Sequence, residues 1–310
     1  MSIQLHERHL WVIVLEPRPS LTFFEDERSP DLKSDCDLSE ISQTLSSKEN
    51  ISTSAFESEI ALIIKDDADR TRKELAKLRD ILEYDLKPKP PRIIYDTYYD
   101  TPEDSLRHRK ISLRTRKLAG NLLISTKSDV RRIRGNIIRR REIELPWSYE
   151  SIRLLAKNLK LAPPKLSVSQ FRRIPASRTL ATMGLEIIQE RRTRREVRGV
   201  VRKGKTPALV LAELAIDRVI YTFKDTKLGL SEVEVEAKSS RSLTTVRDIA
   251  NALVSKYQPV LQQWFQGKFV TGLAIRKLLE TKALQNYLVN GELKPGAFGL
   301  IDRTIRSQEF

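Results

Sequence analysis

The stretch Ser231-Glu-Val-Glu-Val-Glu-Ala-Lys238 is the best guide to the fold class, because its charged residues recur at every second position. Side chains alternate between the two faces of a β-strand, so this period predicts a strand with one charged and one apolar face. The segment from Glu57 to Lys65 has the same period, with Glu57 and Glu59 on one face. Two separate strands therefore carry acidic faces.

Two further predicted strands carry basic or polar faces in the same way. Arg114 and Arg116 share a face in SLRTRK, and Lys127 ends the strand LLISTK. Water-exposed charges over an apolar core would explain any one of these strands. A closed barrel with a polar interior would explain all of them together. In such an interior the carboxylates would need Mg²⁺ or Mn²⁺, and the Arg and Lys side chains would need an anion such as phosphate.

The rest of the chain reads as several short strands with few helices between them. The predicted strands cover residues 92–99, 111–117, 121–127, 136–145, 185–201 and 208–223, and the main predicted helices cover 66–86, 148–161 and 244–257. Hairpin-length turns between many of these strands favour an antiparallel sheet or barrel. We therefore expect a mainly β fold (α+β) with flanking helices.

The charge of the protein points to anionic partners. Its 310 residues include 56 Lys and Arg against 41 Asp and Glu, and Ser105 to Arg141 alone holds 13 basic residues and one acidic residue. Such a basic body attracts nucleic acid, polyphosphate, nucleotides or acidic lipid. No apolar run approaches the about 18 residues of a membrane span, and no secretory signal is recognisable. We therefore expect a cytoplasmic protein that does not enter membranes.

Residues 17–54 are rich in Ser, Asp, Glu and Pro and lack periodicity, so residues 1–54 are predicted to be a flexible acidic leader. We expect deletion of residues 1–50 to leave folding and any activity intact, because this segment lacks the apolar pattern of a core element. Thermal unfolding of the shortened protein checks this. Loss of soluble protein would show instead that the apolar run LWVIVL packs on the folded domain.

One motif matches a nucleotide-binding pattern by letter only. Gly199 to Thr206 fits the P-loop pattern G-x-x-x-x-G-K-[ST]. A P-loop needs an apolar strand before it and a helix after it, whose N-terminus binds the phosphates. Here the charged run RRTRREVR precedes the motif and a strand-like run from Pro207 follows it. The segment is therefore predicted to be a hairpin loop.

In order and spacing, several segments resemble the CYTH superfamily, the triphosphate tunnel metalloenzymes, which include thiamine triphosphatases and class IV adenylate cyclases. The stretches that carry the resemblance are Tyr98 to Pro102 with Ser112 to Arg116, Leu122 to Lys127, Arg141 to Leu145, and Ala212 to Arg218 with Ser231 to Lys238. The resemblance covers about residues 55–275 and leaves 276–310 as a C-terminal extension. It implies an eight-stranded antiparallel β-barrel, the triphosphate tunnel, with flanking helices.

By position, the resemblance also implies which residues carry the chemistry of a metal-dependent triphosphate hydrolase. Glu57 and Glu59 would be catalytic. The ligands of Mg²⁺ or Mn²⁺ would be Glu57, Glu59, Asp217, Glu232, Glu234 and Glu236. The residues that bind the triphosphate would be Arg114, Arg116, Lys127, Arg192, Arg194 and Lys268, the last matching the Lys of a motif at the end of the tunnel.

One position departs from the family pattern. The family's opening motif is E-x-E-x-K, and this chain has Ala61 where the Lys is expected. The missing cation leaves three alternatives: a hydrolase of tripolyphosphate or of an organic triphosphate, a class IV-type adenylate cyclase, or a catalytically weakened module that binds polyphosphate or nucleotides. Nucleic acid is disfavoured as a partner, because the aromatic residues are few and poorly interleaved with the Arg clusters.

Overall fold

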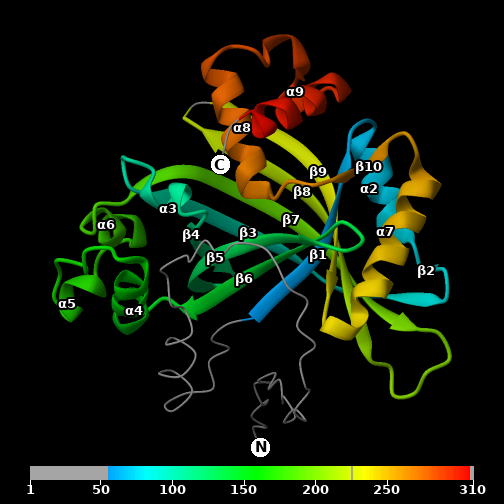
Figure 1. The fold of residues 1–310 in the computed structure, drawn as a ribbon, viewed down its shortest axis with the longest axis horizontal. Coiled ribbons are helices and arrows are strands. Elements are labelled where there is room, and N and C mark those ends of the chain that lie inside the picture. The colour runs from blue at the N-terminus through cyan, green and yellow to red at the C-terminus, as the bar shows by residue number, and fades with distance from the viewer. Residues whose placement is uncertain (1–54, 225, 308–310) are drawn as a thin grey trace, which may run out of the picture. The chain divides into compact units, whose positions relative to one another are not determined.

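The computed structural model describes residues 55–224 and 226–307 (Figure 1), so the predicted leader lies outside the described residues. Eight antiparallel strands form a closed ring, because β9 pairs with β1. In ring order the strands are β1 (Ala55–Ile64), β6 (Ile137–Pro146), β5 (Asn121–Ile133), β4 (Ser112–Leu118), β3 (Tyr84–Asp100), β7 (Glu186–Arg202), β8 (Val210–Phe223) and β9 (Thr226–Ala237). The mainly β, eight-stranded antiparallel fold that we expected is confirmed.

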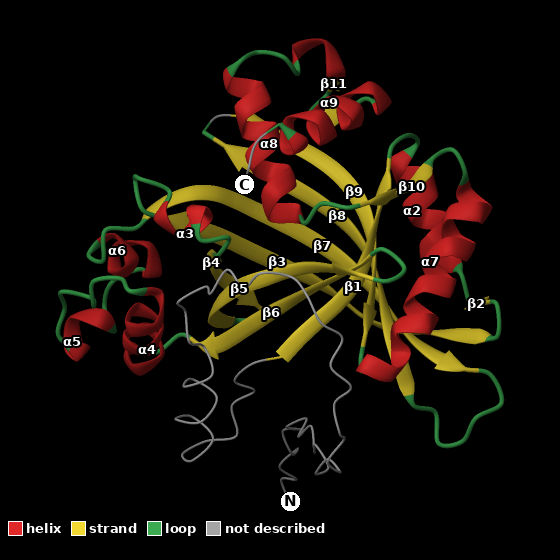
Figure 2. Cartoon of the chain, viewed as in Figure 1, coloured by secondary structure: helices red, strands yellow, loops and turns green. Residues whose placement is uncertain are grey.

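Helices pack around the outside of the ring (Figure 2). The apolar residues of the alternating strands are buried beneath them. The helices α2 (Ala68–Lys77) and α7 (Leu243–Tyr257) pack over β1, β8 and β9. Val233 and Val235 of β9 are fully buried in one cluster with Ile249 of α7. Since neighbouring residues on a strand point to opposite faces, the glutamates between these valines must face the interior of the ring.

A second group of helices covers the other side of the ring. These are α4 (Tyr149–Leu159), α5 (Val168–Phe171) and α6 (Ala176–Ala181). The helix α4 begins after Ser148, whose hydroxyl accepts a hydrogen bond from the backbone N–H of Ser151. It buries Ile152 and Leu155 against Leu113 of β4, with other apolar residues of the same cluster. The outer face is thus an apolar core on both sides, and the charged positions of the strands are left for the interior.

A third layer closes one end of the ring. It consists of β10 (Leu261–Trp264), which pairs with β1, and the helices α8 (Lys268–Glu280) and α9 (Pro295–Arg306). Phe298 and Ile301 of α9 are buried in the same cluster as Ile63 of β1. The predicted domain boundary at residue 275 lies inside α8. Ile301 and Ile305 of α9 pack in the same apolar cluster as Ile275 of α8, and the division at this residue stays a prediction.

The remaining described elements are short. They are β2 (Asp80–Ile81), α3 (Ser105–His108), β11 (Leu288–Val289), β12 (Glu292–Leu293) and the 3₁₀ turns at Ser240–Ser242 and Gln285–Tyr287. The P-loop-like segment joins β7 to β8 with no helix after it, so the predicted hairpin loop is confirmed. Among the described residues, no helix combines the length and the apolar composition needed to cross a membrane.

The predicted helix over residues 66–86 is too long. It ends at Lys77, and β3 already begins at Tyr84. The prolines Pro88, Pro90 and Pro91, which were expected to follow a helix, lie within β3. Proline cannot donate a ladder hydrogen bond, but it is tolerated on an edge or at a bulge. This part of β3 pairs with β7 alone, and Pro90 and Pro91 lie in a register shift between Lys89 and Arg92, where no ladder hydrogen bond is required of them.

Gly272 lets α8 approach the sheet closely, since a Cβ atom at this position would collide with the side chains of Gln189 and Tyr221. We expect Gly272→Ala to lower the free energy of unfolding by roughly 1–3 kcal/mol through overpacking, measured by urea denaturation. Gly299→Ala in α9 is the control, because its Cβ would meet only a terminal nitrogen of Arg303 at 3.7 Å. Alanine favours a helix over glycine. Equal destabilisation by both substitutions would contradict the close docking of α8.

Candidate functional site

Acidic and basic side chains occupy opposite arcs of the inner face of the ring. Most of the acids come from β1, β8 and β9, which are neighbours in the ring, and the bases of the strands come from β6, β5, β4 and β7. Asp96 of β3 and Glu142 of β6 are acids that lie among these bases. They surround a cavity of about 70 Å³ that we call the tunnel site. Its charged lining residues are Glu57, Glu59, Asp96, Glu234, Glu236, Arg114, Arg116, Lys127, Arg140, Arg191, Arg195 and Lys268.

The acidic arc holds three carboxylates that converge. Oxygens of Asp217, Glu232 and Glu234 lie within 4.8 Å of one another. The Nζ atom of Lys268 lies among them, 3.1 Å from Asp217 Oδ2 and 2.5 Å from Glu234 Oε1, and also contacts Glu232. Arg195 approaches from β7, with Nη2 at 2.6 Å from Asp217 Oδ2 and 2.5 Å from Glu234 Oε2. Two cations of the protein thus share the charge of three acids.

The donor atoms of this trio suit a divalent metal ion. All are carboxylate oxygens, the ligands that Mg²⁺ and Mn²⁺ prefer. Glu232 Oε2 is buried and has no hydrogen-bond partner among the described residues, so this oxygen is available as a metal ligand. Burial raises the pKa of Glu232 to about 7, although the Lys268 ammonium acts in the opposite direction. The trio therefore fits a divalent cation, which would compete with the Lys268 ammonium for these oxygens.

Glu57 and Glu59 lie next to the trio on β1. Glu59 is 4 % exposed and forms an ion pair with Arg140, and Glu57 Oε2 lies 2.5 Å from Lys127 Nζ. Burial raises the pKa of Glu59 to about 7 against the charge of Arg140, and the carboxylate of Glu234 adds to the rise. Burial also opposes the charge of Glu57, but Lys127 and Arg140 hold its pKa below the ordinary value. The two acids are thus close in space and differ in electrostatic environment.

The basic arc is organised around a buried acid that sequence reasoning missed. Asp96 of β3 is 2 % exposed and accepts hydrogen bonds from Arg116 at 2.8 and 3.2 Å and from Arg191 at 2.5 Å. Arg114 Nη1 lies 3.7 Å from the same carboxylate. Burial would raise the pKa of Asp96, but the charges of Arg114, Arg191 and Arg116 hold it well below its ordinary value. Asp96 therefore fixes three guanidinium groups beside the cavity.

The guanidinium group of Arg191 has hydrogen-bond donors that are not used within the protein. Nε and Nη1 of Arg191 are buried and have no hydrogen-bond partner among the described residues. A buried donor without an acceptor is costly unless a ligand supplies one. Arginine donates two parallel hydrogen bonds to phosphate oxygens. The free donors of Arg191 are therefore suited to an anionic ligand of this kind.

The placement of Arg192 and Arg194 in the site is corrected by the structure. Both side chains are exposed, and the guanidinium of Arg192 lies 6.0 Å from the ring centre of the half-exposed Tyr95. Arg191 and Arg195, on the other face of β7, line the tunnel site instead. The run Arg-Arg-Thr-Arg-Arg offers arginines to both faces of the strand. The sequence pattern alone could not show which face is inside, and only the pairing with β3 and β8 fixes it.

The other predicted residues lie where the inner face was expected. Arg114, Arg116 and Lys127 line the tunnel site, and Glu236 lies at its edge, with Oε1 at 2.9 Å from Lys238. Residues that the sequence analysis missed are Asp96, Tyr98, Arg140, Arg191 and Arg195. Strand periodicity was a usable signal for some of them, since Arg140 stands two positions before Glu142 and Asp96 two before Tyr98.

Ala61 is packed and not an open gap. It is 3 % exposed, pairs with Trp264 of β10 and with Glu234 of β9, and belongs to an apolar cluster that includes Ala274 of α8. The ammonium of Lys268 already contacts the carboxylate of its neighbour Glu234. The cation that β1 lacks is therefore supplied to this part of the site from α8.

We expect Ala61→Lys to lower the free energy of unfolding by roughly 1–3 kcal/mol, because the longer side chain overpacks a filled space. It should not tighten tripolyphosphate binding in calorimetric titration, since Lys268 already contacts the adjacent acid. Ala61→Met is the matched control for size without charge. Tighter binding or faster turnover by the lysine variant would show that the position is a vacant cation site.

Comparisons with known proteins identify the family of the chain. The CYTH domain family matches residues 55–263. A solved structure of a candidate adenylyl cyclase from Hippeastrum with a dominant triphosphatase activity is 15 % identical to the chain, with a TM-score of 0.45, and the match covers 71 % of this chain and 96 % of that chain. A candidate adenylate cyclase from Bacillus halodurans is 15 % identical, with a TM-score of 0.40 and coverage of 70 % of this chain and 97 % of that chain. The capping enzyme triphosphatase of Mimivirus is 13 % identical, with a TM-score of 0.34 and coverage of 72 % of this chain and 96 % of that chain. No curated protein sequence matches the chain. Since the family match covers more than half of the chain, including all eight strands of the closed ring, the chain belongs to the CYTH domain family.

Proposed function

We propose that the protein is a divalent-metal-dependent triphosphatase that binds a triphosphate in the tunnel site and hydrolyses its terminal phosphoanhydride bond. The observation that supports this most is the distribution of charge around one cavity: the acids Glu57, Glu59, Glu234 and Glu236 lie on β1 and β9, and the bases Arg114, Arg116, Lys127, Arg140 and Arg191 lie on β4 to β7. Phosphoryl transfer requires a hard cation and bound phosphate at one site. Acidic residues can hold the cation, and basic residues opposite them can hold the phosphate. The proposed substrate is inorganic tripolyphosphate or an organic triphosphate.

The basic arc would bind the phosphate chain. Arg114, Arg116 and Lys127 surround the cavity, and the free Nε and Nη1 of Arg191 would donate to phosphate oxygens. Because Asp96 holds the three guanidinium groups in advance, little conformational freedom would be lost on binding. The substrate would be positioned with its chain along this arc.

The acidic arc would hold Mg²⁺ or Mn²⁺ through Asp217, Glu232 and Glu234, with Glu57, Glu59 and Glu236 next to them. When bound, such an ion supplies a Lewis acid that withdraws charge from phosphate oxygens. We propose that the carboxylates of Glu57 and Glu59 accept hydrogen bonds from the attacking water and orient it. Lys268 would offer its ammonium to the phosphate chain from the α8 end of the cavity.

The test is phosphate release from tripolyphosphate, ATP and thiamine triphosphate with Mg²⁺ or Mn²⁺. We expect release from at least one of them, and its loss when EDTA removes the metal. Formation of cyclic AMP and pyrophosphate from ATP would instead support the cyclase alternative, which attacks the α-phosphorus. If none of the three compounds is hydrolysed with metal present, the proposed function is overturned.

A further inference from the structure

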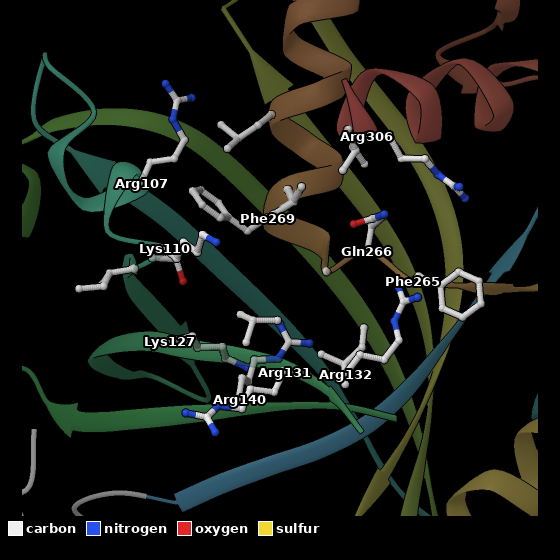
Figure 3. A pocket seen from close by; sticks show the side chains of 18 residues that line it. Arg107, Lys110, Lys127, Arg131, Arg132, Arg140, Phe265, Gln266, Phe269 and Arg306 are labelled. Atoms are coloured by element: carbon white, nitrogen blue, oxygen red, sulfur yellow. The ribbon is translucent and has the colours of Figure 1, made fainter. Parts of the chain in front are cut away.

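A second cavity of about 600 Å³ adjoins the tunnel site, whose volume is about 70 Å³. Figure 3 shows the side chains that line the larger cavity. The two cavities share the lining residues Ser112, Lys127, Arg140 and Phe269, so they lie next to each other. The larger one is also lined by Lys110, Arg131, Arg132 and Phe265. We call it the basic vestibule. Its volume is within the roughly 300–1,000 Å³ of sites for organic ligands.

The charge of the vestibule is unbalanced. None of the described residues that line it is acidic. Arg107 is paired with Asp104, the residue before α3, and Arg306 is paired with Asp302 of α9. Lys110, Arg131 and Arg132, in contrast, are exposed and form no ion pair with any described residue. Cations gathered without counter-ions around a cavity attract an anion from outside the protein.

Aromatic rings lie beside these cations. The guanidinium of Arg132 lies 4.5 Å from the ring centre of Phe265. The ring of Phe269 stacks on Tyr98 of the tunnel site, with 4.7 Å between ring centres and 21° between planes. Phe265 and Phe269 are more than 130 residues away from Arg132 in sequence, and only folding brings them together. The poor interleaving of aromatic and basic residues in the sequence is therefore no argument against a nucleic-acid ligand.

We propose that the basic vestibule binds single-stranded nucleic acid that continues from a 5′-triphosphate held in the tunnel site. This inference rests on the proposed function for the triphosphate. Unpaired bases stack on aromatic rings while cations contact the phosphodiester backbone. A longer inorganic polyphosphate would leave the phenyl rings unused. A single nucleotide would place all its phosphates in the tunnel site and leave Lys110, Arg131 and Arg132 without an anion.

The test compares a short 5′-triphosphorylated oligoribonucleotide, the same strand with a 5′-hydroxyl, ATP and tripolyphosphate. The main variant is the double substitution Arg131→Gln and Arg132→Gln, and the matched control is Arg172→Gln and Arg173→Gln, an exposed pair outside the vestibule. We expect the main variant to weaken binding of both strands at least about tenfold. The slope of log affinity against log salt should become shallower by about 1.4, roughly 0.7 per lost contact.

The kinetics separate the vestibule from the tunnel site. The KM for the triphosphorylated strand should rise in the main variant, while hydrolysis of tripolyphosphate stays unchanged. Phe265→Leu keeps an apolar side chain and should weaken strand binding about five- to a hundredfold by removing the stacking surface. The control pair should change none of these values.

Two results would overturn the inference. One is unchanged strand affinity in both the double variant and Phe265→Leu. The other is that ATP and the triphosphorylated strand are hydrolysed with the same kcat/KM, and that neither value changes in the double variant or in Phe265→Leu. If tripolyphosphate is hydrolysed in either case, the proposed function survives without the vestibule. If no triphosphate is hydrolysed but the 5′-hydroxyl strand binds through Arg131 and Arg132, the vestibule site stands and the proposed function fails.

Discussion

Replacing Glu59 by Gln is expected to reduce metal-dependent phosphate release by at least about a hundredfold, on the order of 3 kcal/mol in activation free energy, while the protein stays folded. Glu59 lines the tunnel site next to the trio of Asp217, Glu232 and Glu234. The amide keeps the shape of the side chain but cannot carry the negative charge that a metal ion or an attacking water needs. Steady-state phosphate release with Mg²⁺ or Mn²⁺ measures the effect.

The variant should stay folded, because burial of the charged Glu59 carboxylate already lowers the stability of the folded parent. Burial raises the pKa of Glu59 to about 7, so a neutral side chain resembles a state that the acid readily adopts near neutral pH. Arg140 loses its ion pair with Glu59 but keeps Glu57 Oε2 at 3.7 Å from its Nε. The melting temperature of the metal-free variant should therefore equal or exceed that of the parent. Glu190→Gln, on an exposed position of β7, is the control for activity.

A large fall in the melting temperature of the metal-free variant would show that Glu59 serves mainly as the structural partner of Arg140. Turnover within a few-fold of the parent would show that the acid does not take part in the reaction. Either result would remove Glu59 from the proposed catalytic residues. The acidic trio on β8 and β9 would then have to support the chemistry without β1.

The closed ring was predictable from sequence because its strands alternate so strictly. Val233 and Val235 alternate with Glu232 and Glu234, and a strand with this pattern must have one apolar and one charged face. What periodicity leaves open is which face is inside. The helices α2 and α7 decide this by burying the valines on the outer face. The charged face is thereby turned into the ring, where the acids of neighbouring strands meet.

The features that were missed depend on pairing and on distant contacts. Arg191 and Arg192 are adjacent and chemically identical, so only the register of β7 against its neighbours separates an inner from an outer arginine. The vestibule is invisible in sequence, because Phe265 and Arg132 are far apart in the chain and come into contact through folding. The prolines of β3 misled the prediction because they read as a stop signal, although an edge segment accepts them.

Replacing Asp96 by Asn is expected to lower the free energy of unfolding by about 3–5 kcal/mol, since it leaves buried cations without their counter-ion. Arg191 loses the largest part of its charge compensation, because the remaining partner of its Nη2 atom is the uncharged hydroxyl of Tyr98, at 2.9 Å. Arg114 retains Glu142 at 2.8 Å, so its loss is smaller. Urea denaturation measures the effect. Asp85→Asn is the matched control on the same strand, because its partner Lys87 is on the surface and exposed ion pairs contribute about 0–1 kcal/mol.

The pH dependence identifies the cause of this loss. Since the three arginines hold the pKa of Asp96 well below its ordinary value, the stabilisation is complete above the unfolded pKa of about 4. It disappears as the pH falls from there towards the folded pKa, so the difference between parent and Asp96→Asn should shrink in acid. Tripolyphosphate should also raise the melting temperature of the variant more than that of the parent, because it returns an anion to the unpaired guanidinium groups. A difference that stays constant down to low pH, with no added response to tripolyphosphate, would mean that Asp96 acts through packing and not through charge.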